Sequence, residues 1–148
     1  MAEDLTMIKK HGGLYSWEHC LTNKIHIPRP GGNQLSRALD TERGLSNYVR
    51  LSFVRDTPML HVAQSDGRIR RPQLLEIDVR VAFEQNTLFS DGNATARKTM
   101  VGSELEDFQR IRFDILRKTT WTNEDEKFYW QAEVLVKRHI PLQYIRNL

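Results

Sequence analysis

Apolar residues alternate with polar or small ones over three stretches of the sequence, a pattern typical of β-strands that bury one face. These stretches lie at residues 47–54, 75–83 and 132–138, and the alternation is clearest in 75–83. Helical spacing of apolar residues predicts helices at 2–10 and 34–43. Because helices come first and strands follow with helices inserted among them, the pattern predicts an α+β fold rather than a doubly wound parallel sheet.

Local signals complete the predicted order of elements. Gly12 and Gly13 are expected to end the first helix. The other predicted elements are, in chain order, a loop at 28–33, a strand at 59–64, a short run at 87–90 ended by an Asp-Gly turn signal, a helix at 93–100, a helix from a Ser103–Glu106 capping box toward 117, a loop at 118–128 and a turn from Pro141.

Length and composition narrow the class of protein. A chain of 148 residues can bury one hydrophobic core, so we predict a single domain over 1–148. The net charge of +3 permits a nucleic-acid partner without requiring one. No apolar run reaches the about 20 residues that cross a bilayer, and the first residues lack the apolar core of a signal peptide. We therefore expect a cytoplasmic protein that does not bind membranes.

Motifs for the commonest catalytic sites are absent from the sequence. There is no GxxxxGK[ST] loop, no GxGxxG turn after a strand, no GxSxG elbow and no HExxH helix. The single cysteine, Cys20, excludes an internal disulfide and a structural zinc site built on thiolates. Among the histidines only His19 and His26 have a spacing that resembles metal ligands, and we expect no metal.

Glu133 stands out because it lies inside the otherwise apolar strand AEVLV. A carboxylate is disfavoured in strands and costly to bury without a partner. It is either a functional carboxylate or a residue that faces solvent on a half-exposed strand. Arg37 follows a glycine-containing loop at the start of a helix, where an arginine can bind phosphate. The alternative for Arg37 is an exposed helix residue.

Four segments, in order along the chain, carry a resemblance to a known family. They are AEDLTMIKKHGGLYS, GLSNYVRLSFVRDTPMLHV, TLFSDGNATA and QAEVLVKRHIP. Together they resemble the DarT family of DNA ADP-ribosyltransferases, the toxins of toxin–antitoxin pairs. The resemblance implies an ADP-ribosyltransferase-like split β-sheet sandwich with small helices, with NAD held between two small sheets. It further implies transfer of ADP-ribose from NAD to thymine or guanine in single-stranded DNA, and a macrodomain antitoxin as partner.

The resemblance also assigns roles to individual residues. The family's catalytic glutamate falls on Glu133, which would bind the nicotinamide ribose and stabilise the oxocarbenium-like transition state. The arginine that contacts NAD falls on Arg37, with Arg43 as the second choice. The remaining residues assigned by resemblance are Tyr48 for NAD binding and Arg55, Met59, Asn93, Lys118 and Trp121 for contacts to DNA.

The sequence departs from the family at its start, where relatives have a strand carrying a histidine that binds the nicotinamide ribose. Here the first predicted helix begins at residue 2, so either the true start lies upstream or the fold is shortened at the N-terminus. This departure keeps a second hypothesis open, a non-catalytic module of the same fold that binds nucleotides or nucleic acid. A third is an RNA 2′-phosphotransferase, which relies on basic residues rather than on a glutamate.

Overall fold

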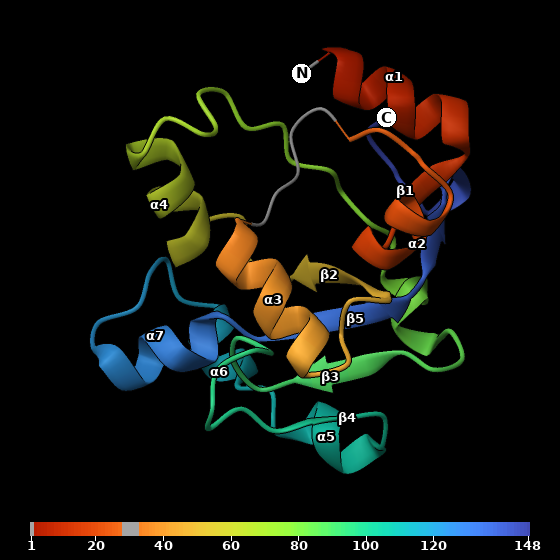
Figure 1. Cartoon of the computed structure of the whole chain (residues 1–148). Helices are drawn as coiled ribbons and strands as arrows, with labels where there is room; N and C mark the ends of the chain where they lie inside the picture. The colour runs from red at the N-terminus through yellow and green to blue at the C-terminus, as the bar shows by residue number, and fades with distance from the viewer. Residues whose placement is uncertain (1, 28–32) are drawn as a thin grey trace. The chain divides into compact units, whose positions relative to one another are not determined.

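The computed structural model describes residues 2–27 and 33–148 (Figure 1). Residue contacts divide the chain into two compact units, which we describe separately. Unit 1 consists of Met1–Val49, Leu75–Thr87 and Val136–Leu148, and unit 2 of Arg50–Leu74 and Leu88–Leu135. A single domain over 1–148 stays a prediction. The loop expected at 28–33 lies outside the described residues except for Asn33.

Unit 1 is built on a small two-stranded sheet. Strand β1 (Gly13–Tyr15) pairs antiparallel with β6 (His139–Pro141). The helices of the unit are α1 (Ala2–His11), α2 (Trp17–Thr22), α3 (Gln34–Glu42) and the 3-10 turns η1 (Val79–Phe83) and η2 (Leu142–Tyr144). The helices predicted at 2–10 and 34–43 are therefore confirmed. Gly13 has φ +147°, and a Cβ atom there would lie 2.1 Å from the Ile140 carbonyl oxygen, so this strand pair requires glycine.

The strand predicted at 75–83 is wrong. Ile77 makes an isolated bridge to Ile145, and the chain then turns into η1. Asp78 causes the change, because its Oδ1 accepts a hydrogen bond from the Arg80 backbone N–H at 2.9 Å, a donor that a strand would pair with its neighbour. The guanidinium groups of Arg80 and Arg146 also hydrogen-bond this carboxylate and hold the pKa of Asp78 well below its usual range.

A stack of three rings in unit 1 makes its stability sensitive to acid. Tyr15 lies between His19 and His139, at ring-centroid distances of 4.5 Å and 4.1 Å. Burial lowers the pKa of His139 below its ordinary 6.5. As the pH falls below about 6.5, the unfolded chain takes up this proton before the folded one does, so the free energy of unfolding is expected to fall. Urea denaturation at pH 7.5 and pH 5.5 measures this loss, which His139→Gln should reduce. An unchanged loss in this variant would contradict the assignment to His139.

Unit 2 contains most of a four-stranded sheet with the order β2-β5-β3-β4. Strands β2 (Tyr48–Ser52) and β5 (Glu133–Lys137) each continue from one unit into the other, whereas β3 (Leu88–Ser90) and β4 (Val101–Gly102) lie in unit 2. Strand β3 is antiparallel to both neighbours, and Ser90 lies opposite Glu133. The strands predicted at 47–54 and 132–138 are confirmed, and β3 matches the short strand that the resemblance implies in TLFSDGNATA.

The strand predicted at 59–64 is wrong, because this segment forms helix α4 (Pro58–Ser65). Thr57 is the N-cap, and its Oγ1 accepts a hydrogen bond from the Leu60 backbone N–H at 3.2 Å. Pro58 occupies the first turn, where its missing N–H costs no helical hydrogen bond. These start signals outweigh the apolar run that suggested a strand.

Polar side chains also decide the structure of residues 93–100, where the predicted helix is absent and turns replace it. The Asn93 Oδ1 atom accepts hydrogen bonds from the Thr95 backbone N–H at 3.1 Å and from its hydroxyl at 2.8 Å. The Thr99 hydroxyl donates to the Asn93 carbonyl at 2.6 Å. Such local bonds offer the backbone an alternative to the helix.

Three short helices follow in unit 2: α5 (Leu105–Gln109), α6 (Phe113–Leu116) and α7 (Glu124–Trp130). The capping box lies one residue later than predicted, at Glu104 and Asp107, and opens α5 alone. The loop expected at 118–128 is wrong in its second half. Asn123 starts α7 there by accepting the Glu126 backbone N–H at 2.9 Å.

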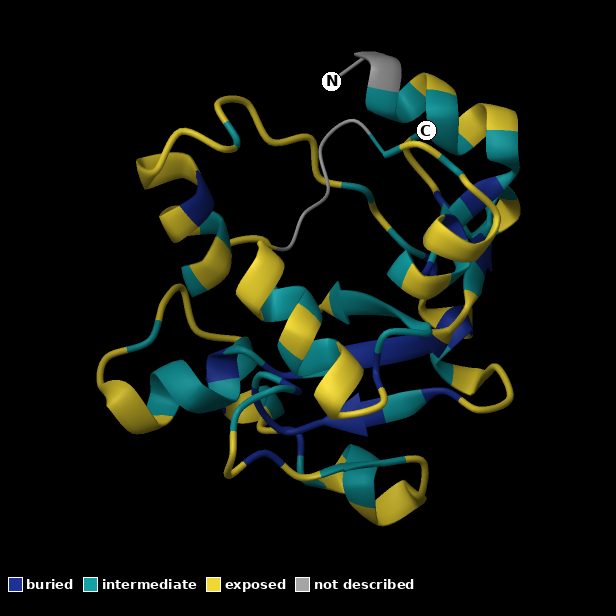
Figure 2. Cartoon of the chain, viewed as in Figure 1, coloured by how far each residue is buried: buried dark blue, intermediate teal, exposed yellow. Residues whose placement is uncertain are grey.

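The core of unit 2 gathers around β3 and β5, which Figure 2 shows as largely buried. Its buried apolar residues are Ala63, Phe89, Ala94, Ile111, Ile115, Trp130, Ala132, Val134 and Leu135. Trp130 is fixed by its indole N–H, which donates to the Asp56 carbonyl at 2.7 Å. This packing holds the start of β5, and therefore Glu133, in a defined place.

Candidate active site

Glu133 is the first residue of β5, and its backbone is anchored to the neighbouring strand. Its N–H donates to the Ser90 hydroxyl at 3.2 Å, which in turn donates to the Gly92 carbonyl at 2.8 Å. The Glu133 side chain is 15% exposed, so solvent or a ligand can reach it although most of it is covered. The Glu133 carboxylate is therefore neither fully buried nor freely solvated.

Arg50 of β2 holds the Glu133 carboxylate in a two-pronged ion pair. Its Nε donates to Oε1 at 3.0 Å and its Nη2 to Oε2 at 2.6 Å. The backbone N–H of Ala94 donates to Oε2 at 2.9 Å. A guanidinium and a carboxylate that meet in this way are restricted in both distance and orientation.

Asn93 joins the cluster through its contact with Arg50. Its Oδ1 accepts a hydrogen bond from Arg50 Nη2 at 3.0 Å. The Thr95 hydroxyl and N–H donate to the same oxygen, which identifies it as the amide oxygen. In this structure Asn93 supports Arg50, and its contact with DNA stays a prediction.

This arrangement suits chemistry in which positive charge develops on a substrate. Each carboxylate oxygen has two lone pairs, so Oε1 can accept a hydrogen bond from a substrate hydroxyl while it accepts one from Arg50. A fixed, partly desolvated carboxylate stabilises a developing cation more strongly than one in water. Cleavage of a glycosidic bond through an oxocarbenium-like state is a reaction of this kind.

Other predicted site residues of unit 2 lie on its surface. Arg55 is exposed in the segment between β2 and α4, and Met59 is 41% exposed in the first turn of α4. The Lys118 ammonium hydrogen-bonds the carboxylate of Glu126. The pKa of Glu126 is lowered to about 2, and this hydrogen bond is the largest cause of the shift. Trp121 is half-buried, with its ring 6.1 Å from that of Trp130. Their contacts with DNA stay predictions.

The three residues predicted to contact NAD belong to unit 1. Arg37 lies in α3 with its guanidinium 4.6 Å from the centroid of the Trp17 ring, a cation–π contact. Arg43 is the exposed C-cap of α3, and Tyr48 is the half-buried first residue of β2. Glu133, by contrast, belongs to unit 2. Their roles stay predictions.

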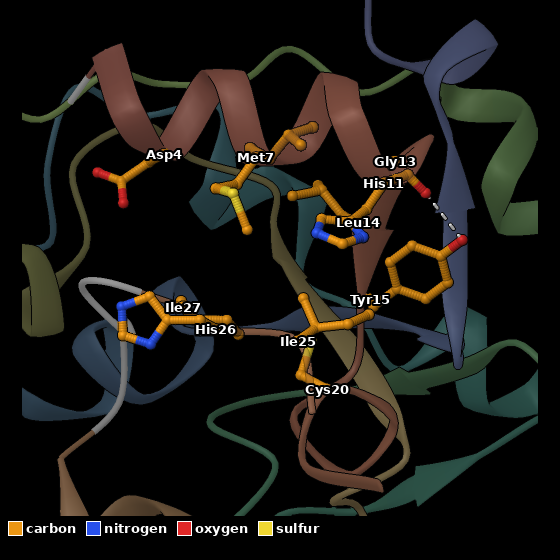
Figure 3. Close-up of a pocket in the computed structure, with 11 residues that line it drawn as sticks. Asp4, Met7, His11, Gly13, Leu14, Tyr15, Cys20, Ile25, His26 and Ile27 are labelled. Atoms are coloured by element: carbon orange, nitrogen blue, oxygen red, sulfur yellow. Dashed lines mark hydrogen bonds between the residues drawn. The ribbon is translucent and has the colours of Figure 1, made fainter. Parts of the chain in front are cut away.

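Unit 1 contains a cavity of about 200 Å³ (Figure 3). Its wall is mostly apolar and includes Met7, which points from α1 toward the segment that carries Ile25 and His26. The other lining residues are Asp4, Ile8, His11, Gly13, Leu14, Tyr15, Cys20 and Ile27. Burial raises the pKa of the Cys20 thiol, which keeps it in its less reactive form. A mostly apolar wall with a few polar groups is typical of small-molecule sites.

The structure describes residues 2–27 and 33–148. Within these ranges no group of three or more His, Cys, Asp or Glu side chains is arranged to hold a metal ion. No helix formed by the same residues has the length and apolar character needed to cross a membrane.

The family model "ssDNA thymidine ADP-ribosyltransferase, DarT" matches residues 2–148. Thermosipho africanus DarTG in complex with ADP-ribose matches with a TM-score of 0.73 and 21% identity, over 95% of this chain and 39% of that one. Thermus sp. 2.9 DarT in complex with ADP-ribosylated ssDNA matches with a TM-score of 0.70 and 18% identity, over 96% and 74% of the two chains.

The complex of the same Thermus protein with NAD+ gives a TM-score of 0.66 at 18% identity, over 97% of this chain and 74% of that one. No curated protein matches the sequence. This chain thus spans about two fifths of the Thermosipho chain and about three quarters of the Thermus chain. The structural likeness confirms the expected ADP-ribosyltransferase fold.

Proposed function

Because this chain belongs to the DarT family of single-stranded DNA ADP-ribosyltransferases, we propose that it transfers ADP-ribose from NAD to a base in single-stranded DNA. The observation that carries the proposal is the Glu133 carboxylate, held by Arg50 and by the Ala94 N–H yet still reachable. The similar structures contain ADP-ribose, NAD+ and ADP-ribosylated ssDNA, which supports the same substrates here.

The proposed reaction breaks the bond between the nicotinamide nitrogen and C1′ of its ribose. The electron pair of this bond leaves with nicotinamide, a base nitrogen bonds to C1′, and that nitrogen loses its proton. Glu133 accepts a hydrogen bond from a hydroxyl of the ribose through Oε1, and its negative charge stabilises the positive charge that develops on the sugar. It is also our candidate for the group that takes up the base proton.

Thymine is the base that the family description names, and guanine is the other base that the resemblance implies. Oligonucleotides that contain only one of these two bases, otherwise matched in length and composition, separate the possibilities.

The mostly apolar cavity in unit 1 is our candidate for the site of a planar ring of NAD, such as adenine. Met7→Trp would fill the cavity and is expected to weaken NAD binding at least about tenfold, since it removes the space that the ring would occupy. Titration calorimetry with NAD measures the effect. Lys10→Trp, on an exposed position of the same helix, is the matched control and should bind NAD like the unsubstituted chain. Equal affinities for all three proteins would place the ring elsewhere.

A macrodomain protein that removes ADP-ribose from DNA is the proposed partner, because a toxin of this kind requires a reversing enzyme. The similar Thermosipho protein is a DarTG. Expression of this chain should slow bacterial growth, and co-expression of an active macrodomain hydrolase should restore it.

Release of nicotinamide from NAD tests the proposed function. We expect it to depend on added single-stranded DNA and to be much slower with duplex DNA, whose bases are paired and stacked. NAD binding without release of nicotinamide, with or without DNA, would instead favour the non-catalytic module. Transfer of an RNA 2′-phosphate to NAD, undiminished in Glu133→Gln, would favour the phosphotransferase.

A further inference from the structure

Arg50 connects the Glu133 carboxylate to a turn of a different segment. Its Nη2 donates both to Glu133 Oε2 at 2.6 Å and to Asn93 Oδ1 at 3.0 Å, while its Nε donates to Glu133 Oε1 at 3.0 Å. Both side chains of the ion pair are 15% exposed. The guanidinium is therefore fixed at several points and does not sample solvent as a surface arginine does.

The turn that receives Arg50 also binds Glu133 directly. Thr95 fixes the orientation of the Asn93 amide through hydrogen bonds of 2.8 Å and 3.1 Å, and the next residue after Asn93, Ala94, donates its N–H to Glu133 Oε2 at 2.9 Å. The Glu133 carboxylate is thus held by the Arg50 guanidinium and the Ala94 N–H, and Arg50 is itself bound to Asn93. We call Arg50, Asn93 and Ala94 the frame of the carboxylate. The frame determines which way the two carboxylate oxygens face.

From this frame we infer that Arg50 is a positioning residue that sets the orientation of the Glu133 carboxylate for the transfer step. The inference rests on the proposed function. The planar fork of arginine is required, because it reaches both carboxylate oxygens and Asn93 together, which the single ammonium of a lysine does not. A displacement of about 1 Å at a reacting group can cost on the order of 10²-fold in rate.

Two variants separate the charge of Arg50 from its shape. Arg50→Lys keeps the positive charge and loses the fork, whereas Arg50→Gln loses the charge and most of the contacts. We expect kcat for ADP-ribose transfer to fall about 10²-fold in Arg50→Gln and about 10-fold or more in Arg50→Lys. The KM for NAD should change less than about threefold, because the effect passes through Glu133 rather than through ground-state binding.

Arg112→Gln is the matched control, since Arg112 also pairs with a carboxylate, that of Asp114, but both side chains are exposed, at 48% and 62%. It should keep the kcat of the unsubstituted chain. Thermal unfolding of each variant shows whether it is folded. A folded Arg50→Gln with an unchanged kcat, or with a KM effect alone, would overturn the inference, and an inactive unsubstituted chain would overturn the proposed function instead.

A readout that does not require activity tests the inference in either case. In a crystal structure of Arg50→Gln we expect the Glu133 carboxylate to leave the Ala94 N–H or to spread over more than one rotamer. If the Glu133 carboxylate kept its position and its contact with the Ala94 N–H in Arg50→Gln, the inference would be wrong. Soaking the crystals with guanidinium should return the carboxylate to its original place.

Discussion

Glu133→Gln is expected to lower kcat for ADP-ribose transfer about 10²–10⁴-fold. Glutamine has nearly the same shape as glutamate but carries no charge, so it cannot stabilise the cation that develops on the ribose or take up the base proton. Its amide nitrogen would also face a donor that now meets a carboxylate oxygen, either the Arg50 Nε–H or the Ala94 N–H. Steady-state assays of DNA modification at varied NAD concentration measure kcat and KM.

Glu124→Gln is the matched control for this loss. Glu124 is a carboxylate at the start of α7 with a side chain that is 89% exposed, and it lies 3.9 Å from Lys127. Its replacement should leave kcat unchanged. If Glu133→Gln and Glu124→Gln were equally active, Glu133 would not be the catalytic carboxylate.

Leu135→Ala is expected to lower the free energy of unfolding by about 2–5 kcal/mol. Leu135 is fully buried at the centre of β5, where it lies opposite Leu88 of β3. Truncation removes buried apolar surface and leaves a void in the layer that supports the site. The denaturant midpoint and slope of urea unfolding, followed by tryptophan fluorescence, give this free energy.

Leu105→Ala provides the comparison, because the same atoms are removed from a side chain that is 70% exposed. Its free energy of unfolding should change by no more than about 0.5 kcal/mol. Similar losses in the two variants would contradict the assignment of the core to β3 and β5.

Elements with strong periodicity could be predicted from the sequence, and those decided by single polar side chains could not. The strands at 47–54 and 132–138 form because alternation matches a sheet with one buried face. The alternation at 75–83 is the clearest of the three, yet Asp78 turns this segment into a 3-10 helix by capping it. Thr57 converts the apolar run after Pro58 into a helix in the same way.

The candidate site could be predicted in part. Glu133 was identifiable because a carboxylate inside an apolar strand is unusual, and the resemblance to the family gave it a role. Arg50 was missed, because nothing in its own strand distinguishes it from a residue that faces solvent. Its importance arises from a contact with a residue 83 positions away, which depends on β2 lying next to β5 in the sheet.

Intact-mass analysis of single-stranded oligonucleotides, after incubation with the protein and NAD, tests the central claim most directly. We expect a mass gain of one ADP-ribose on oligonucleotides that contain the accepted base, and no gain with Glu133→Gln. No gain on any oligonucleotide, by folded protein that binds NAD, would contradict the account and leave a binding module of the same fold.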